Sequence, residues 1–295
     1  MPRIRYRDFG FRKDRLELIE QANTIIREYG LQGFDLTLRQ LYYQFVSRDL
    51  IENNERSYKR IGNMVNDGRL AGLIDWNAIV DRTRALEALS HWQDAEEIIA
   101  SCAAQFRLDK WEDQPVRVEV WVEKEALAGV IESACDPLDV PYFSCRGYVS
   151  QSEMWKAARR MRDRHTIVLY LGDHDPSGID MTRDVRDRLT EFGGSVEVKR
   201  IALNMDQIQQ YSPPPNFAKL SDSRAADYVD QFGTDSWELD ALEPKVMVDL
   251  ITTEVKAVMD ERAFADTCEL QQEARGDIAA VAENWDMAVD AARTQ

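Results

Sequence analysis

Apolar residues recur every three or four positions through the first third of the chain, a spacing typical of amphipathic helices. This pattern predicts a helix over residues 12–29, which Gly30 would end. A second helix is expected from residue 38 to about residue 50. Thr37 and Gln40 stand at the spacing of a capping box, in which each side chain accepts a hydrogen bond from the other residue's backbone N–H. The start of the second helix is therefore clearly marked.

Two further short helices follow in the pattern. Ser57 is expected to cap the first, whose buried face would carry Ile61, Met64 and Val65. Asp75 is expected to cap the second, which would begin at the next residue. Short helices at this spacing, several with a basic face, resemble a helix-turn-helix or winged-helix module. A plain helical bundle fits the same periodicity.

The middle of the chain changes from a helical to an alternating pattern. A long helix is expected over residues 85–106 and a linker over 109–114. After the linker, β-rich runs alternate with helical patterns, which indicates a parallel sheet with right-handed crossovers. The expected strands cover residues 116–122, 140–145, 166–171 and 196–203, and the helices between them cover 126–134, 152–164 and 179–192.

The last third has a less regular pattern. Residues 213–215 are three prolines, so a loop is expected there. Helical patterns resume at 223–232 and again from Pro244, a favoured first helical residue, to near the C-terminus. We therefore expect an α/β protein of two domains. A winged-helix-like domain would cover residues 1–110, and a parallel-sheet α/β domain with a helical extension would cover 111–295.

Charge is unevenly distributed along the chain. The formal net charge is −16, which taken alone argues against a nucleic-acid partner. Residues 1–84, however, hold 15 Lys and Arg against 12 Asp and Glu, whereas residues 201–295 hold 7 against 19. The N-terminal third is therefore the expected DNA surface.

The sequence indicates neither a membrane protein nor a zinc-binding protein. No apolar run approaches the roughly 18 residues of a membrane span, and the basic start leads into no apolar core of a signal peptide. We expect a soluble cytoplasmic protein with no membrane partner. The four cysteines form no Cys-x-x-Cys pair, and there are only three histidines, so a zinc site is not expected.

Carboxylates follow two of the expected strands. Glu123 ends the first strand, and Asp173 and Asp175 follow the third. Ligands of open α/β sheets bind beyond the carboxyl ends of the strands, so these acids are expected to converge. Converging carboxylates repel by about 4 kcal/mol per pair at a separation of about 4 Å. A hard cation such as Mg²⁺ relieves that repulsion. Exposed loop acids are the alternative, but a strand-end Glu fifty positions before the Asp-x-Asp favours a metal site.

Several short motifs together resemble a known family. The Glu and the Asp-x-Asp are similar to those of the Toprim domain of topoisomerases, primases and some nucleases. Residues 122–126 (VEKEA), 145–148 (CRGY) and 172–179 (GDHDPSGI) resemble, in this order, the topoisomerase VI A subunit and the related meiotic double-strand-break protein. The short chain is most similar to the stand-alone mini-A relatives, which lack a fused ATPase. The resemblance implies a Toprim-like fold and a Mg²⁺ ion, for which Mn²⁺ can substitute, at Glu123, Asp173 and Asp175.

The same family implies a tyrosine nucleophile. Residues 38–43 (LRQLYY) resemble the family's Arg-x-hydrophobic-aromatic-Tyr motif, whose last residue, Tyr43, would form a 5′-phosphotyrosyl link to DNA. A phenol with a pKa of about 10 is a weak nucleophile at neutral pH. Arg39, one helical turn earlier, could hold the phosphate and favour the phenolate. Tyr42 is expected to pack inward. The alternative is that both tyrosines are core aromatics.

Partners also follow from the resemblance. The family's A subunits act as homodimers on double-stranded DNA, each tyrosine serving the other protomer's metal site. Strand passage would need a separate ATPase B-type subunit, since no Walker-A loop is present here. Lys59 and Arg60 are expected to contact the DNA backbone, and Arg146 the phosphate near the metal, although solvated charges are the default on any surface. His174, inside the acidic turn, is given no role.

Three functions remain open from the sequence. The first is a tyrosine transesterase of the isomerase class that cleaves DNA. The second is a Toprim endonuclease that hydrolyses DNA with metal-activated water, in which Tyr43 is structural. The third is a non-catalytic DNA-binding protein, against which the intact Glu and Asp-x-Asp argue. Residues 237–242 either supply further acids near the site or mark a helix boundary.

Overall fold

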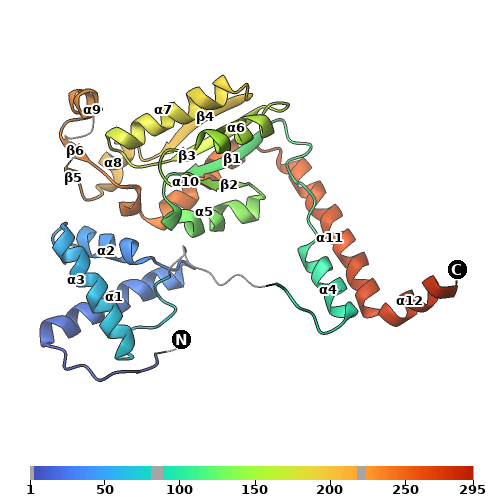
Figure 1. The fold of residues 1–295 in the computed structure, drawn as a ribbon, viewed down its shortest axis with the longest axis horizontal. Coiled ribbons are helices and arrows are strands. Elements are labelled where there is room, and N and C mark those ends of the chain that lie inside the picture. The colour runs from blue at the N-terminus through green and yellow to red at the C-terminus, as the bar shows by residue number, and fades with distance from the viewer. Residues whose placement is uncertain (1–2, 81–88, 218–223, 295) are drawn as a thin grey trace. The chain divides into compact units, whose positions relative to one another are not determined.

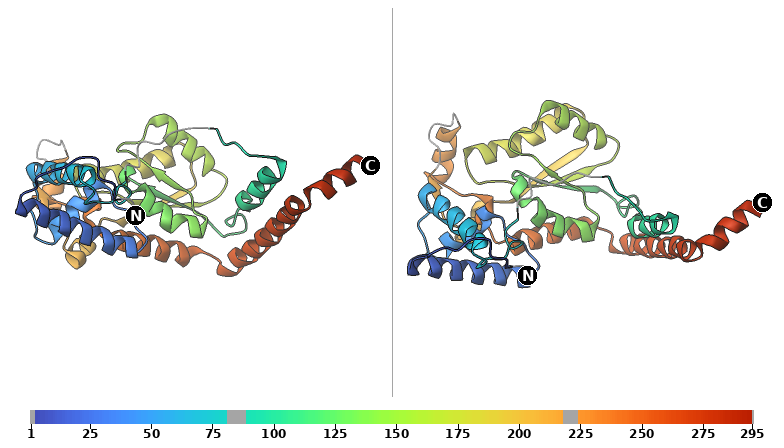
Figure 2. Two further views of the ribbon diagram at one scale, coloured as in Figure 1. Left: turned by 90° about the horizontal axis from the view of Figure 1, so that it is seen from below. Right: turned by 60° about the horizontal axis from the view of Figure 1, so that its bottom comes forward.

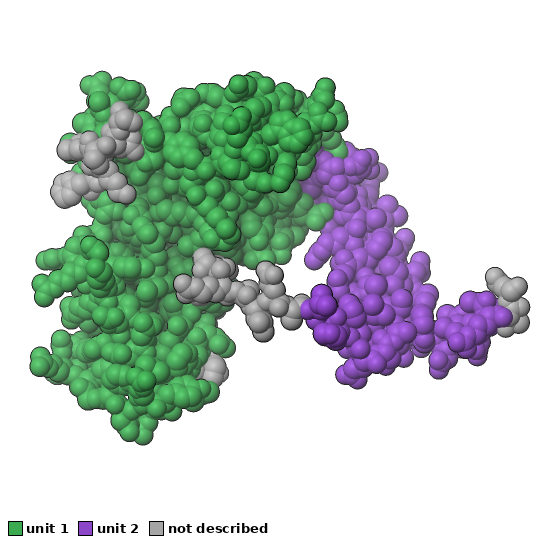
Figure 3. Space-filling view, viewed as in Figure 1, with its two compact units in different colours: residues 1–84, 118–253 green, residues 85–117, 254–295 purple. Residues whose placement is uncertain are grey.

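The chain folds as a mixed α/β protein in a computed structural model, which describes residues 3–80, 89–217 and 224–294 (Figure 1). Its residues form two compact units, shown in different colours in Figure 3. The first unit combines residues 1–84 with 118–253, and the second combines 85–117 with 254–295. Each unit is thus made of two separate stretches of chain, whereas the sequence suggested one boundary near residue 110.

Three helices form the N-terminal part of the first unit. The predicted capping box is present, because the Thr37 hydroxyl accepts from the Gln40 amide at 3.3 Å and the Gln40 side chain accepts from the Thr37 amide at 2.8 Å. The third helix starts earlier than predicted, since Asn54 rather than Ser57 caps it, accepting from the Ser57 amide at 2.8 Å. The helices are α1 (Lys13–Leu31), α2 (Leu38–Ser47) and α3 (Glu55–Leu70).

The predicted fourth helix is absent. The Asp75 carboxylate accepts from the Asn77 amide at 2.8 Å and closes a turn instead, an alternative bond that Asp side chains offer in place of a helix start. Two isolated β-bridges join Arg5 to Ala71 and Leu36 to Ile79. Residues 3–80 therefore contain helices and single bridges but no longer strand, and the winged-helix layout stays a prediction.

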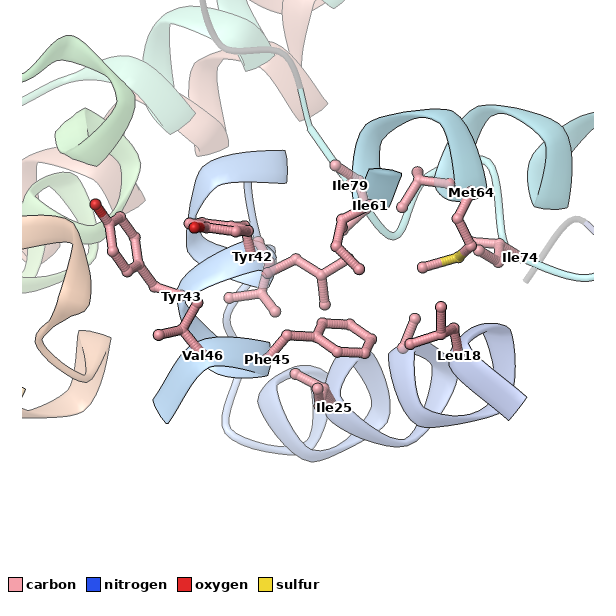
Figure 4. Close-up of a cluster of buried hydrophobic side chains, with 14 of the residues drawn as sticks. Leu18, Ile25, Tyr42, Tyr43, Phe45, Val46, Ile61, Met64, Ile74 and Ile79 are labelled. Atoms are coloured by element: carbon pink, nitrogen blue, oxygen red, sulfur yellow. The ribbon is translucent and has the colours of Figure 1, made fainter. Parts of the chain in front are cut away.

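The three helices enclose a core of their own (Figure 4). Leu18 and Ile25 come from α1, Phe45 from α2, and Ile61 and Met64 from α3. All five side chains are buried, as the helical spacing of apolar residues predicts. Packing in this core fixes the orientation of α2 and so determines where its polar side chains lie.

A four-stranded parallel sheet forms the other part of the first unit, in the order β2-β1-β3-β4. β1 and β3 are therefore neighbours at its centre, and their carboxyl ends lie side by side. The expected strands are confirmed to within a few residues at each end. They are β1 (Arg117–Val122), β2 (Tyr142–Ser144), β3 (Thr166–Leu171) and β4 (Val196–Ala202).

Helices connect the strands and cover the sheet (Figure 1). Met154 of α6 and Val185 of α7 pack in one cluster with Trp121 and Val168 of the sheet. Side chains alternate along a strand, so Val120 and Val122 of β1 face the opposite side, where Figure 1 shows α5. The connecting elements are η1 (Glu125–Leu127), α5 (Ala128–Cys135), η2 (Asp136–Leu138), α6 (Gln151–Arg160) and α7 (Pro176–Glu191).

Further elements follow the sheet, and the last of them, α10, continues from the first unit into the second. Residues 213–215 form the expected loop, and Pro244 is the first residue of its helix, as predicted. The two shortest strands pair with each other in antiparallel fashion. The elements are α8 (Met205–Tyr211), β5 (Asn216–Phe217), α9 (Ala225–Phe232), β6 (Asp235–Ser236), η3 (Leu239–Ala241) and α10 (Pro244–Val258).

The second unit is helical. Its long helix α11 (Glu261–Glu283) packs along α4 (Ala95–Gln105), as Figure 2 shows, and α12 (Trp285–Thr294) follows it. The helix predicted over 85–106 is shorter in the described residues, because Asp94 caps it by accepting from the Glu97 amide at 2.8 Å. Residues 85–88 of that prediction lie outside the described residues.

The expected linker over residues 109–114 is instead a packed turn of the second unit. Trp111 is buried there. The Gln114 side chain exchanges two hydrogen bonds with the backbone of Asp260, at 2.9 and 2.6 Å. Within the part of the chain that the structure describes, no helix is both long and apolar enough to cross a membrane.

Candidate active site

Two of the three predicted acids meet at the carboxyl end of the sheet. Glu123 directly follows β1, and Asp173 follows the neighbouring β3 after one glycine. The Glu123 carboxylate accepts from the Asp173 amide at 2.9 Å. Residues fifty positions apart are thereby joined, as expected from the order of strands in a parallel sheet. Burial and the nearby Asp173 carboxylate raise the pKa of Glu123 to about 7.

Glycines make room for the Glu123 carboxylate. A Cβ atom on Gly172 would lie 2.8 Å from a Glu123 carboxylate oxygen, and one on Gly178 would lie 3.2 Å from it and overlap the Asp173 carbonyl. From β4, the Arg200 guanidinium donates to the carbonyl oxygens of Gly172 and Asp173 at 2.8 and 2.6 Å. These two hydrogen bonds therefore fix the backbone of the acidic turn against β4.

Asp175 and His174 have structural tasks within this turn. The Asp175 carboxylate accepts from the Gly178 amide at 2.7 Å and so caps α7. The His174 ring is buried against Tyr228, whose hydroxyl lies 2.8 Å from its Nδ1 atom, and against Trp237. Burial lowers the pKa of His174 to about 4. His174 is therefore neutral at physiological pH and packs the turn against α9 and β6.

Lys124 lies among three carboxylates that the sequence does not show to be close. Its ammonium is 2.8 Å from an Asp173 oxygen, 2.9 Å from Glu238 and 3.1 Å from Asp240. Burial opposes the charged form, but Asp240, Asp173 and Glu238 outweigh it and raise the pKa of Lys124. Asp173 also accepts from the Leu239 amide at 2.7 Å. Residues 237–242 thus both supply acids to the site and form a short helix, η3.

Arg39 contacts the same acids from α2. Its Nε atom lies 3.0 Å from the Asp240 carboxylate, and its terminal nitrogen forms an ion pair with Glu238. The guanidinium carbon is 6.0 Å from the centre of the Tyr43 ring, consistent with the predicted common face of the helix. Arg39 therefore links the predicted nucleophile's helix to the acidic cluster.

Tyr43 lies at the border between the helical core and the acidic cluster. Its side chain is 4% exposed, but Figure 4 shows its hydroxyl directed away from the apolar cluster. The hydroxyl accepts from the Asn216 side chain at 3.5 Å. Burial and then Glu238 raise the pKa of Tyr43 to about 12, although Asn216, Arg39 and Lys124 act in the opposite direction. Tyr42 is buried as expected, and its hydroxyl donates to Asn53 at 2.8 Å.

A pocket of about 720 Å³ joins these groups. It is large enough to admit a nucleotide-sized group, since ligand pockets commonly measure about 300–1,000 Å³. The predicted nucleophile and its arginine thus share one cavity with two of the three predicted metal ligands. The residues of the site that line it are Arg39, Tyr43, Lys124, Asp173, Asp175 and Glu238.

The three predicted DNA-contacting residues do not themselves line this pocket, although Glu55, the ion-pair partner of Lys59, does. Lys59 forms an exposed ion pair with Glu55 at 2.7 Å, and Arg60 lies 3.8 Å from Asp14. Arg146 forms an ion pair with Glu125 after β2. None of the three lines the pocket in the described part of the chain, and their DNA contacts stay predictions.

The carboxylates fit a hydrated cation better than a fully enclosed one. Across residues 3–80, 89–217 and 224–294, no three His, Cys, Asp or Glu side chains gather into a ready metal site. Mg²⁺, however, usually keeps several waters and binds through one or two carboxylates together with substrate phosphates. Asp173 and Asp175 line the pocket and could supply such ligands, with Glu123 behind them.

Several residues of the site were missed in the sequence. Lys124 lies inside the VEKEA motif, and its position next to Glu123 was the available signal. Glu238 and Asp240 lie in the segment whose acids were left open. Nothing in the sequence pointed to Asn216 or Arg200, because each acts through contacts with residues distant along the chain.

No model of a known protein family matches this chain, and no curated protein does. The resemblance to topoisomerase VI A subunits therefore rests on the motifs alone.

Proposed function

We propose that the protein cleaves DNA by Mg²⁺-dependent tyrosine transesterification, in the manner of a type IIB topoisomerase A subunit. One observation carries the proposal: Tyr43 and Arg39 line the same pocket as Asp173 and Asp175. A nucleophile, a cation and a pair of metal-binding carboxylates around one cavity are the groups that phosphoryl transfer to a tyrosine needs.

The chemistry requires no oxidant or energy source. The Tyr43 hydroxyl loses its proton, its oxygen bonds to the phosphorus, and the bond from phosphorus to the 3′ oxygen breaks. The 3′ oxygen takes up a proton and leaves as a hydroxyl, while the 5′ end stays attached to the protein. Because one ester replaces another, the reverse reaction can reseal the strand.

The charge of the pocket explains the need for a metal. Glu238 raises the pKa of the phenol, and the acids repel a DNA phosphate. A Mg²⁺ ion held by Asp173 and Asp175 would supply positive charge to both the phosphate and the phenolate. Arg39 would place the Tyr43 helix against the acids. Double-stranded DNA as substrate, a homodimer and a separate ATPase subunit belong to the same proposal.

Hydrolysis by a Toprim endonuclease is the second candidate, and the burial of Tyr43 favours it. A phenol that is 4% exposed, with its pKa raised to about 12, is a less ready nucleophile than a metal-bound water. In that reaction Tyr43 would serve only to pack α2 against the acidic segment.

Supercoiled plasmid incubated with the protein and Mg²⁺ or Mn²⁺ distinguishes the two candidates. Transesterification leaves protein attached to 5′ ends on denaturing gels, and Tyr43→Phe should lower cleavage by at least about 10³-fold, as loss of a nucleophile does in other enzymes. Tyr42→Phe is the matched control, because Tyr42 adjoins Tyr43 on α2 and its hydroxyl bonds within the protein. Cleavage that persists in Tyr43→Phe without attached protein would establish hydrolysis instead.

A further inference from the structure

Lys124 places a positive charge at the acidic turn itself. Its ammonium is 2.8 Å from the Oδ1 atom of Asp173, and the Leu239 amide donates to the same oxygen at 2.7 Å. Two donors therefore occupy one oxygen of a predicted metal ligand. Lys124 also lines the pocket together with Asp173, so its side chain borders the space in which a metal ion would bind.

Two further carboxylates contact the same ammonium. Glu238 lies 2.9 Å from it and Asp240 lies 3.1 Å from it. The Asp240 side chain is fully buried, and its second carboxylate oxygen has no hydrogen-bond partner within the part of the chain that the structure describes. Three acids from two distant segments thus share the Lys124 ammonium.

These contacts all lie in the stretch of chain that carries the sheet. Lys124 follows β1, Asp173 follows β3, and the other two acids lie at η3. None of the four residues belongs to the N-terminal helices. The arrangement around Lys124 is therefore the same whichever protomer supplies the tyrosine to this site.

We propose that Lys124 is a built-in counter-cation of the metal site, which competes with Mg²⁺ for Asp173 and so weakens the binding of the ion. The inference rests on the Mg²⁺ site of the proposed function and concerns what sets the affinity of that site. A divalent ion at Asp173 must either bind the other carboxylate oxygen beside the ammonium or displace the ammonium from Oδ1. The first brings like charges together, and the second removes an ion pair from a largely buried lysine, so both lower the affinity.

The same ammonium stabilises the protein when no divalent ion is bound. Removing it would leave carboxylates with less compensating charge in a site of low polarity, which is unfavourable. A divalent ion could supply the missing charge, because carboxylate oxygens are the ligands that Mg²⁺ prefers. Lys124→Met should therefore lower the stability in EDTA and raise the affinity for divalent ions. A lysine that served only to anchor the segment around η3 would give no such rise.

Mn²⁺ binding measures the competition directly. Calorimetric titration of the full chain with Mn²⁺ gives the Kd of the wild type and of each variant. Lys124→Met should bind Mn²⁺ at least about tenfold more tightly, because a positive charge beside the ion is removed. Lys124→Arg keeps that charge and should stay close to the wild type. Lys245→Met, in an exposed ion pair on α10, is the matched control and should also bind as the wild type does.

Each result of this titration decides the question. Tighter binding by Lys124→Met, or binding by that variant alone, supports the inference if adding Asp173→Ala abolishes the gain. Equal or weaker binding overturns the inference and leaves the metal site of the proposed function in place. A gain that persists without the Asp173 carboxylate also overturns it. If neither the wild type nor any variant binds Mn²⁺, the inference and the metal-dependent function fail together.

Unfolding measurements keep the test decisive if loss of the ammonium disturbs the fold. Urea denaturation of Lys124→Met and of Lys124→Gln, which keeps N–H donors without the charge, is compared in EDTA and in excess Mn²⁺. An ion that binds the folded state more tightly stabilises it more. Mn²⁺ should therefore stabilise both variants more than the wild type, and should fold a variant that is unfolded in EDTA. Variants that gain no more stability from Mn²⁺ than the wild type overturn the inference.

Discussion

At the scale of single residues, the site is dominated by carboxylates that would repel one another if no cation lay among them. Lys124 and Arg39 neutralise Glu238 and Asp240, and although burial opposes ionisation of Glu238, these two cations lower its pKa overall. Among the described residues, no cation lies at hydrogen-bond distance from Glu123, and burial and Asp173 raise its pKa. Ionisation of Glu123 therefore costs the folded protein free energy, and so does ionisation of Asp173, whose pKa burial also raises.

Stability in EDTA should consequently fall as the pH rises. The pKa of Glu123 is about 7 in the folded protein and 4.5 as the reference value, so the folded state binds more protons between these limits. Its stabilising contribution is present below about pH 4.5 and is lost as pH rises through about 7. Glu123→Gln should reduce this loss, for a gain of about 2–3 kcal/mol at about pH 8, while the raised pKa of Asp173 leaves part of the decline in place.

Urea denaturation at about pH 5 and about pH 8 measures this difference. Glu153→Gln, on the exposed side of α6, is the matched control and should follow the wild-type trend. A wild-type stability that does not decline over this interval would contradict the expectation. Added Mg²⁺ should reverse the decline in the wild type more than in Glu123→Gln.

At the scale of elements, local chemistry explains where helices start and how closely the acidic turn packs. The capping box at Thr37 fixes the start of α2, and Asp175 fixes the start of α7 immediately after the acids. The first turn of α7 contains Gly178, whose missing side chain lets the Glu123 and Asp173 groups approach. The first turn of α7 and the packing of the acidic groups therefore both require a residue without a side chain at Gly178.

Gly178→Ala should destabilise the protein by at least about 2 kcal/mol, because the added Cβ would overlap the Asp173 carbonyl in a closely packed turn. Gly276→Ala in α11 should do the opposite. No atom lies within 4 Å of its new Cβ, and alanine favours a helix over glycine by about 1 kcal/mol. Thermal unfolding of both variants tests the pair. Equal effects of the two substitutions would show that the turn relaxes more than the structure implies.

At the scale of the whole molecule, the proposed function requires a chain of net charge −16 to approach DNA. The N-terminal stretch carries a small excess of basic residues, and Lys59 and Arg60 lie exposed on α3. Phosphate contacts release counterions, so the number of such contacts sets the salt dependence of binding. Under the proposed function, charge distribution rather than net charge therefore decides which face is expected to bind DNA.

Replacing Lys59 and Arg60 together with Ala should weaken DNA binding at every sequence alike. The slope of log K against log salt should become shallower by about 2, roughly 0.9 for each lost phosphate contact. Fluorescence anisotropy with a short duplex at several salt concentrations provides the measurement. Lys245→Ala, in the exposed pair with Asp249 on α10, is the control and should leave the slope unchanged. An unaltered slope in the double variant would place the DNA surface elsewhere.

Local patterns predicted much of the fold. The β-rich runs gave the sheet strands to within a few residues, and the Thr37 capping box was identified correctly. Errors arose where two polar residues competed for one helix end, as with Asn54 and Ser57, or where Asp75 closed a turn. Such choices depend on small differences in free energy that neighbouring contacts decide.

The sequence by itself determined that acids follow the ends of two strands and that Arg39 and Tyr43 share a helical face, because the strand period and the helical period are local properties. The order of the strands, which makes β1 and β3 neighbours, was decided by the tertiary structure. Only the tertiary structure brought Glu238, Asp240 and Asn216 to Lys124 and Tyr43. It did so through residues 235–243, which contact both the acidic turn and the N-terminal helices. Contacts of that kind arise from packing and buried charge, which no short stretch of residues encodes.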